Sequence, residues 1–254
     1  MRDTYPTNIF PDQIRKAIAI CKKDIRIYYC KGPVIIFGLL LPLFLFLAFS
    51  IGRNLSLSFL VPGMLGMSVF FTSTSVVPVI APWETRMKTF ERLVSAPVTV
   101  ATIIFGDILA SAIFGLFIST VPVAVGLLAG TPIINFPIML LSIVLSSFCF
   151  SSLGALLSAP PSDTPATVMM LSSLVKFPLV FISGIFIPLE SMPLWGRFIA
   201  YLSPLTYFVD LVRHSTQGTG QIPLHLDLII LLAFTFFFFY VAVKLHQRSI
   251  PQRI

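Results

Sequence analysis

Charged residues are scarce in this chain, and one long stretch has none. Asp, Glu, Lys and Arg make up 11% of the 254 residues, against about 25% in a typical soluble domain. No such residue occurs between Ile108 and Ser162. Only a bilayer accommodates so long an apolar segment, so a soluble enzyme or binding domain is excluded and an integral membrane protein is predicted.

Residues that bind metals are also few. The three cysteines, Cys21, Cys30 and Cys149, are too scattered for a disulfide framework and lack metal-ligand spacing. The three histidines are isolated in the sequence, so we assign no ligand role to His214, His225 or His246. We therefore expect no metal or cofactor on this chain.

The phosphate-binding loop GxxxxGK[ST] does not occur in the sequence. Without it, no backbone amides are arranged to hold a nucleotide. The ten acidic residues are too dispersed for the paired carboxylates of a lipid-processing enzyme, which ranks last among the functions considered. The chain is not expected to be an enzyme.

The net charge of +7 is concentrated near the N-terminus, where seven Lys and Arg precede Pro33. This placement is typical of a topology signal and of contact with anionic lipids, and it argues against nucleic-acid binding. Residues 1–32 alternate apolar and basic side chains at helical spacing and predict an amphipathic helix along the inner membrane face; a plain topology anchor is a compatible alternative. The apolar positions are Ile14, Ala17, Ile18, Cys21, Ile25 and Tyr28.

The apolar segments predict an all-α integral membrane protein, one domain over residues 1–254, with six transmembrane helices. Their expected bounds are 33–51, 57–81, 99–127, 136–157, 167–187 and 226–245.

Six spans place both termini on the same side of the membrane. That side carries most of the Lys and Arg, whereas the other carries only Arg53, Arg197 and Arg213. Because basic loops stay inside, we expect a multi-pass protein of the cytoplasmic membrane with both termini in the cytoplasm.

The cytoplasmic loop 82–97 is predicted to hold a short amphipathic helix. Trp83, Met87, Phe90 and Val94 fall on one helical stripe, and Glu84 and Lys88 are spaced for an ion pair. Such a helix could rest on lipid headgroups or dock into a groove of a cytoplasmic partner. The charged positions around the stripe are Glu84, Arg86, Lys88, Glu91 and Arg92.

The segment 188–214 is too polar for a span and too apolar for a free loop. It predicts a re-entrant helical hairpin at the outer surface, with helices over 192–202 and 205–212 that meet at Ser203 and Pro204. Asp210 and Arg213 are three residues apart and are expected to form a structural pair. The other candidate residues of this outer hairpin are Glu190, Trp195, Pro204 and Tyr207.

At this point the chain resembles a known family. The motifs FPLVFISGIFIPLESMP and YLSPLTYFVDLVR, together with KTFERLVSAPVT, resemble permease subunits of type-2 ATP-binding-cassette (ABC) exporters. The resemblance covers nearly the whole chain. It implies a dimer of identical or paralogous permeases, each bound to a cytoplasmic ABC ATPase subunit that binds ATP and Mg. It also implies that Trp83 to Arg92 form the ATPase-coupling helix and that the outer hairpin shapes a gate.

Two charges fall inside predicted spans, Asp107 in the third and Lys176 in the fifth. Ionised groups at that depth normally face partners or water, so they could pair with each other or line a substrate path. Alternatively, Asp107 is hydrated near the interface, and Lys176 extends to the surface or marks a shifted boundary.

The leading hypothesis is therefore a multidrug-type ABC exporter permease that works by alternating access. Its substrate would be amphipathic, drug-like or lipid-linked, with a polysaccharide among the lipid-linked candidates. The alternative is an ion-coupled secondary transporter with Asp107 as the coupling carboxylate, although no internal repeat supports it.

Overall fold

The computed structural model describes residues 10–29, 36, 40–50, 57–162 and 164–253. Within these ranges every regular element is a helix and no strand occurs, which confirms the predicted all-α class. The elements other than the bundle helices described below are α1 (Phe10–Asp24), the π-helix η1 (Ile25–Tyr29), α3 (Leu41–Ser50), α6 (Phe90–Ser95), the 3-10 turn η3 (Leu189–Ser191), α10 (Leu194–Ala200) and α11 (Pro204–Gln217).

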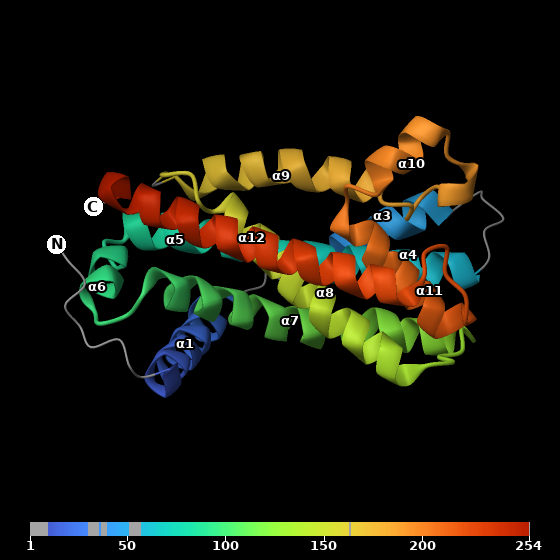
Figure 1. Ribbon diagram of the computed structural model, residues 1–254, viewed down its shortest axis with the longest axis horizontal. Helices are drawn as coiled ribbons and strands as arrows, with labels where there is room; N and C mark the ends of the chain where they lie inside the picture. The colour runs from blue at the N-terminus through green and yellow to red at the C-terminus, as the bar shows by residue number, and fades with distance from the viewer. Residues whose placement is uncertain (1–9, 30–35, 37–39, 51–56, 163, 254) are drawn as a thin grey trace.

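The remaining helices form an elongated bundle. They are α4 (Leu57–Ser75), α5 (Val77–Arg86), α7 (Val100–Leu128), α8 (Phe136–Leu157), α9 (Pro165–Ile182) and α12 (Leu224–Arg253). Figure 1 shows them along the long axis of the molecule, with α1 lying across the bundle. Five helical stretches in the described part are long and apolar enough to cross a membrane, since α4 and α5 together form one of them. The chain is thus a multi-pass membrane protein.

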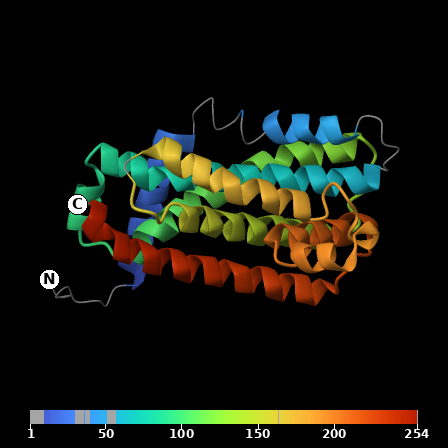
Figure 2. The same ribbon diagram turned by 90° about the horizontal axis from the view of Figure 1, so that it is seen from above.

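The two ends of the bundle carry different elements. α6 and the last turns of α12 lie at one end, which we call the α6 end, and α1 lies toward this end (Figures 1 and 2). α10, α11 and the turn between α7 and α8 lie at the other, which we call the α11 end. Any segment that couples to a partner at the α6 end is therefore a bundle length away from the hairpin.

The observed helices differ from several predicted spans. α8 has the predicted bounds, and α7 begins and ends one residue later than expected. The second span was expected to end at Ala81, but α5 continues it to Arg86. The fifth ends early, at Ile182, and the sixth extends to Arg253. Of the first predicted span only Ile36, Leu40 and α3 are described, and the loop 52–56 lies outside the described residues, so the six-span count stays a prediction.

Small polar residues let α4, α7 and α8 approach closely. The Ser111 hydroxyl on α7 donates to the Ser73 carbonyl on α4 at 2.8 Å. A Cβ on Gly115 would lie 2.4 Å from the Ser73 Oγ, so a larger residue there would require the Ser73 side chain to move. Small residues at such interfaces are typical of membrane helices, where packing replaces the hydrophobic effect as the source of association.

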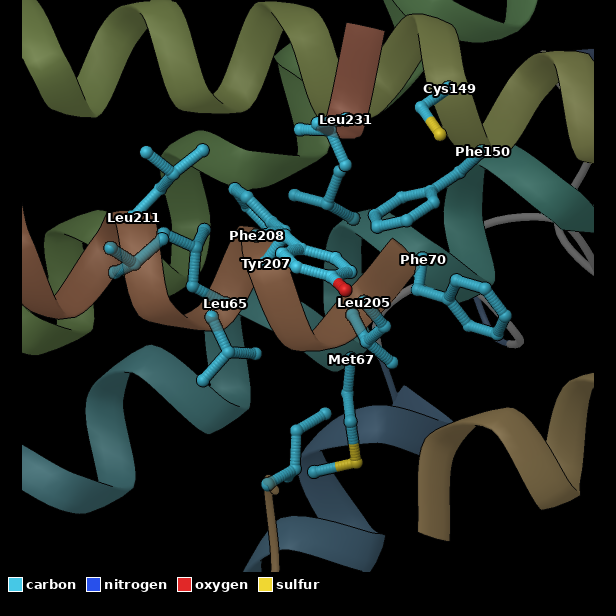
Figure 3. Packing of buried hydrophobic residues seen from close by; sticks show 14 of the residues in the cluster. Leu65, Met67, Phe70, Cys149, Phe150, Leu205, Tyr207, Phe208, Leu211 and Leu231 are labelled. Atoms are coloured by element: carbon cyan, nitrogen blue, oxygen red, sulfur yellow. The ribbon is translucent and has the colours of Figure 1, made fainter. Parts of the chain in front are cut away.

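The main apolar core surrounds α11. Figure 3 shows Phe208 and Leu205 of α11 between side chains of α4, α8 and α12. Phe150 packs edge-on against Phe70 at 5.0 Å and against Phe208 at 5.8 Å between ring centroids, arrangements favoured by aromatic quadrupoles. α11 is thus held inside the protein.

Candidate functional site

The predicted coupling segment is two helices joined by a sharp turn. α5 ends at Arg86, Lys88 adopts a left-handed conformation with φ of 55°, and α6 begins at Phe90. The amide of Thr89 donates to the Glu84 carbonyl and that of Lys88 to the Thr85 carbonyl. These two bonds form a Schellman motif, which closes α5 and changes the chain direction. The prediction of one continuous helix over Trp83–Val94 was wrong.

Because of this turn, the predicted apolar stripe is divided. Trp83 and Met87 are 41% and 65% exposed, whereas Phe90 is 6% exposed. Phe90 and Val94 line a small pocket with Ile103 and Ile104 of α7. The outward apolar knobs at the α6 end are therefore Trp83 and Met87, and Phe90 anchors α6 to the bundle.

The charges of this segment also divide. Arg86, Lys88, Glu91 and Arg92 are exposed, but Glu84 is buried. Glu84 binds the ammonium of Lys23 on α1 through Oε1. The expected ion pair between Glu84 and Lys88 was wrong, because the turn gives Lys88 a different direction and α1 supplies the cation.

A cluster of four charged side chains joins α1, α5 and α7. The Lys23 Nζ lies 3.0 Å from Asp24 Oδ1 as well as binding Glu84, and Asp24 and Glu84 are 0% and 4% exposed. Asp107 of α7 is also buried and interacts electrostatically with Asp24 and Lys23. We call Lys23, Asp24, Glu84 and Asp107 the charge cluster.

The charge cluster perturbs the groups of α1 and η1. Burial alone would lower the pKa of Lys23, but the carboxylates of Asp24 and Glu84 raise it above its usual value. Burial raises the pKa of Asp24, and Lys23 opposes this shift. Burial, followed by the Glu84 charge, raises the pKa of Tyr28. Lys23 thus stays charged throughout the physiological range, as the cation that Asp24 and Glu84 share.

The structure gives Asp107 and Lys176 different surroundings. Asp107 belongs to the charge cluster, whereas Lys176 of α9 donates from Nζ to the Thr74 carbonyl of α4 at 2.7 Å. Thr74 precedes Pro78 by four residues, and proline has no N–H to bond that carbonyl. Lys176 therefore supplies the donor that the helix lacks there. The hypothesis that the two residues pair with each other is not supported by any contact in the described residues.

The hairpin at the α11 end contains the two helices expected, and Pro204 is the first residue of α11. The Tyr207 hydroxyl donates to the Tyr201 carbonyl at 2.7 Å, and Trp195 is 69% exposed. Glu190 accepts from the Gln221 side chain at 2.8 Å.

Asp210 and Arg213 each have other partners in place of the expected pair. Asp210 accepts the backbone N–H groups of Gln221 and Ile222 at 2.8 to 3.0 Å. Arg213 donates to the Gly184 carbonyl at 3.2 Å and lies 5.1 Å from the centre of the Phe59 ring. The expected pair was wrong because the loop after α11 folds back onto Asp210. His214, expected to be isolated, donates to the Ile222 carbonyl at 2.8 Å.

Sequence reasoning overlooked Lys23, Asp24 and Asp227 as interior groups. α1 buries Ala17, Cys21 and Asp24, whereas Ile14 and Ile18 of the predicted apolar stripe are about half exposed. Asp24 follows Ala17 by seven residues and Cys21 by three, so it falls on the buried face of the helix. That spacing was the signal available in the sequence.

Three curated relatives align with 61 to 76% of this chain. The inner membrane transport permease YadH of Escherichia coli K12 is 26% identical over 194 residues, covering 76% of this chain and 75% of the relative. Nodulation protein J of Sinorhizobium fredii is 25% identical over 76% of this chain and 74% of its own. The probable multidrug ABC transporter permease YbhR of E. coli K12 is 23% identical over 61% of this chain and 42% of its own.

The chain also matches a family model over most of its length. The model described as ABC-2 type transporter matches residues 18–216, from the middle of α1 to the end of α11. This range includes the charge cluster, the α5–α6 turn and the hairpin. The chain therefore belongs to the ABC-2 type transporter family.

Proposed function

We propose that this chain is the membrane permease subunit of an ATP-driven ABC exporter. The family match over residues 18–216 carries the proposal, because it spans both the α5–α6 turn and the hairpin. The sequence has no phosphate-binding loop of its own. The ATPase, with its ATP and Mg, is then a separate cytoplasmic subunit, and the α6 end faces the cytoplasm with both termini.

Trp83 and Met87 are the contact point for that ATPase. They are exposed apolar side chains beside Arg86 and Lys88, and they project where α5 turns into α6. Apolar knobs surrounded by charges suit insertion into a partner's groove. α4 and α5 form one continuous apolar stretch, and Glu84 of α5 binds Lys23 of α1. A displacement of Met87 by the ATPase would therefore be transmitted to α5, α4 and α1.

The transport direction and cargo follow from the family as a proposal. YbhR is named a probable multidrug permease, and we infer for this chain an amphipathic, drug-like or lipid-linked substrate moved outward by alternating access. A second permease copy and membrane lipids would cover the exposed aromatic residues of α12, among them Phe236 and Phe237. The ion-coupled alternative with Asp107 is not favoured, because Asp107 lies buried in the charge cluster.

The test is co-purification with the ATPase and transport in inside-out vesicles. Met87→Asp places a charge on the proposed knob, and Leu202→Asp at the α11 end is the matched control, since Met87 and Leu202 are 65% and 69% exposed. We expect an ABC ATPase, identified by mass spectrometry, to bind the wild-type chain and L202D but not M87D, and ATP-dependent uptake of a fluorescent drug to be lost in M87D. Phe90 is unsuitable as a target because it is buried. Cargo movement by the chain alone in vesicles without any nucleotide hydrolase would refute the proposal.

A further inference from the structure

Three side chains that can bind a metal converge at the α11 end. Asp210 and His214 lie one turn apart on α11, and Asp227 lies in the first turn of α12. The His214 Nε2 is 3.9 Å from an oxygen of each aspartate, and the three potential ligand atoms all lie within 4.8 Å of one another. These residues come from two helices joined by a short loop, so the chain itself assembles the group.

Asp227 is the unsatisfied member. Its side chain is fully buried, and within the described residues neither of its oxygens accepts a hydrogen bond. Asp210, by contrast, is held by the amides of Gln221 and Ile222. A buried carboxylate without a donor is costly unless a cation or a proton neutralises it. The carboxylate of Asp227 faces His214, which places the missing positive charge between them.

Among the described residues, no neighbouring Lys or Arg forms an ion pair with Asp227. Arg213 interacts electrostatically with Asp210 and Glu190, but its guanidinium donates to the Gly184 carbonyl and lies over the Phe59 ring. Within the described residues, the ion-pair partner of Asp227 is His214. Glu190, the other ionised group of the hairpin near this loop, is an acid and binds Gln221. Asp227 therefore has an imidazole, and no Lys or Arg, within ion-pair distance in the described part of the chain.

The loop backbone at Gly220 lies close to the donor atoms. A Cβ on Gly220 would lie 2.2 Å from the His214 Nε2 and 2.7 Å from an Asp210 oxygen. Glycine is the residue that allows backbone to approach a site this closely. Any side chain at position 220 would occupy the space between the ligands.

We propose that Asp210, His214 and Asp227 bind a divalent transition-metal ion, with Zn²⁺ the best fit. One imidazole with two carboxylates is a donor set that Zn²⁺ accepts, at bond lengths of about 2.0 to 2.2 Å. Tetrahedral ligands at that length are roughly 3.4 Å apart. The two separations from the His214 Nε2, 3.9 Å each, therefore need a small contraction, and the aspartate oxygens, which lie within 4.8 Å of each other, must approach more closely as the ion binds. Binding replaces the Nε2 hydrogen bond to Ile222, with the ring proton moving to Nδ1, and water takes the fourth position.

The ion would fasten α11 to α12. Its ligands lie on both sides of the 218–223 loop, so the metal closes that loop and fixes the hairpin against the last span. This role is independent of the proposed ATPase contact, which lies at the opposite end of the bundle (Figure 1).

The test is Zn²⁺ binding by the full chain in detergent after treatment with EDTA. We expect one Zn²⁺ per chain by competition with a chromophoric chelator, and a rise in the melting temperature on addition. Asp227→Asn and His214→Gln should each weaken affinity at least tenfold, and Gly220→Ala should do the same by filling the site. The matched control is His225→Gln, because His225 is an exposed histidine on the same segment.

The possible outcomes distinguish a bound metal ion from a proton that the two aspartates share. The proposal is overturned if the wild-type chain binds no Zn²⁺, or if D227N and H214Q bind it as tightly as the wild-type chain does. If the wild-type chain binds no metal while D227N raises the melting temperature above neutral pH, the two aspartates share a proton in place of a metal, which also overturns it. Loss of binding in H225Q alone would place the metal elsewhere.

Discussion

Lys23 of α1 and Glu84 of α5 form a salt bridge although 61 positions separate them in the sequence. The bridge joins the N-terminal helix to the helix that ends at the α5–α6 turn. Glu84 directly follows the exposed Trp83, so the same turn of α5 presents one residue outward and one to α1. Movement of α5 therefore cannot leave α1 unchanged.

Lys23→Met should destabilise the chain by roughly 3 kcal/mol, at the low end for a buried pair because the Lys23 side chain is 29% exposed. The loss arises because Asp24 and Glu84 remain buried without their cation. Thermal unfolding in detergent measures it. Lys16→Met is the control: the pair of Lys16 with Asp12 is more exposed, and its removal should cost less than about 1 kcal/mol. Equal effects of the two changes would contradict the role of the charge cluster.

The sequence predicts the helices better than it predicts their contacts. The bounds of α8 follow from an uncharged run between Asn135, whose side chain caps the first turn, and Ser158. The break at Lys88 was not predicted, because helical spacing continues through it and the left-handed residue is not a glycine. The charge cluster also could not be predicted, since Lys23, Glu84 and Asp107 meet only after three helices pack.

Lys88→Gly should stabilise the chain by about 1 kcal/mol, because Lys88 occupies a left-handed conformation that glycine adopts without steric cost. Arg86→Gly is the matched control: Arg86 is also exposed but ends α5 in helical geometry, so glycine there should cost up to about 1 kcal/mol. Melting temperatures of the two variants should move in opposite directions. A fall in both melting temperatures would mean that the α5–α6 turn of the membrane-inserted protein is not a Schellman motif.

Gly106→Ala should separate α1 from α7. A Cβ at Gly106 would lie 2.8 Å from the Ile20 Cβ and 3.0 Å from the Ala17 carbonyl oxygen, so the α1 backbone must shift. Overpacking of this kind costs about 1 to 3 kcal/mol. Gly196→Ala is the control, since its nearest neighbour would be a side-chain atom at 3.5 Å. Protease sensitivity of α1 should rise in G106A only.

Stability should fall as pH rises above about 4 through the contribution of Asp24. Burial raises the folded-state pKa of Asp24 above its ordinary value, so the folded chain holds this proton more tightly than the unfolded chain. The stabilisation is complete below the unfolded pKa of about 3.9 and is lost through the folded pKa. Asp24→Asn removes the linkage, and melting temperatures from pH 4 to 8 should decline less steeply. An unchanged slope would show that Asp24 is hydrated.

Lys176→Met should leave the Thr74 carbonyl without a donor, because Pro78 cannot provide the N–H of a normal helix. An orphaned buried acceptor costs about 1 to 3 kcal/mol. Pro78→Ala restores that N–H, so the double variant should lose less stability than Lys176→Met alone; thermal unfolding of the four proteins completes the cycle.

Transport measurements distinguish this role of Lys176 from a role in the substrate path. If Lys176 only supports the helix, activity should recover with stability in the double variant. Transport that stays low after stability is restored would place the ammonium group in the substrate path.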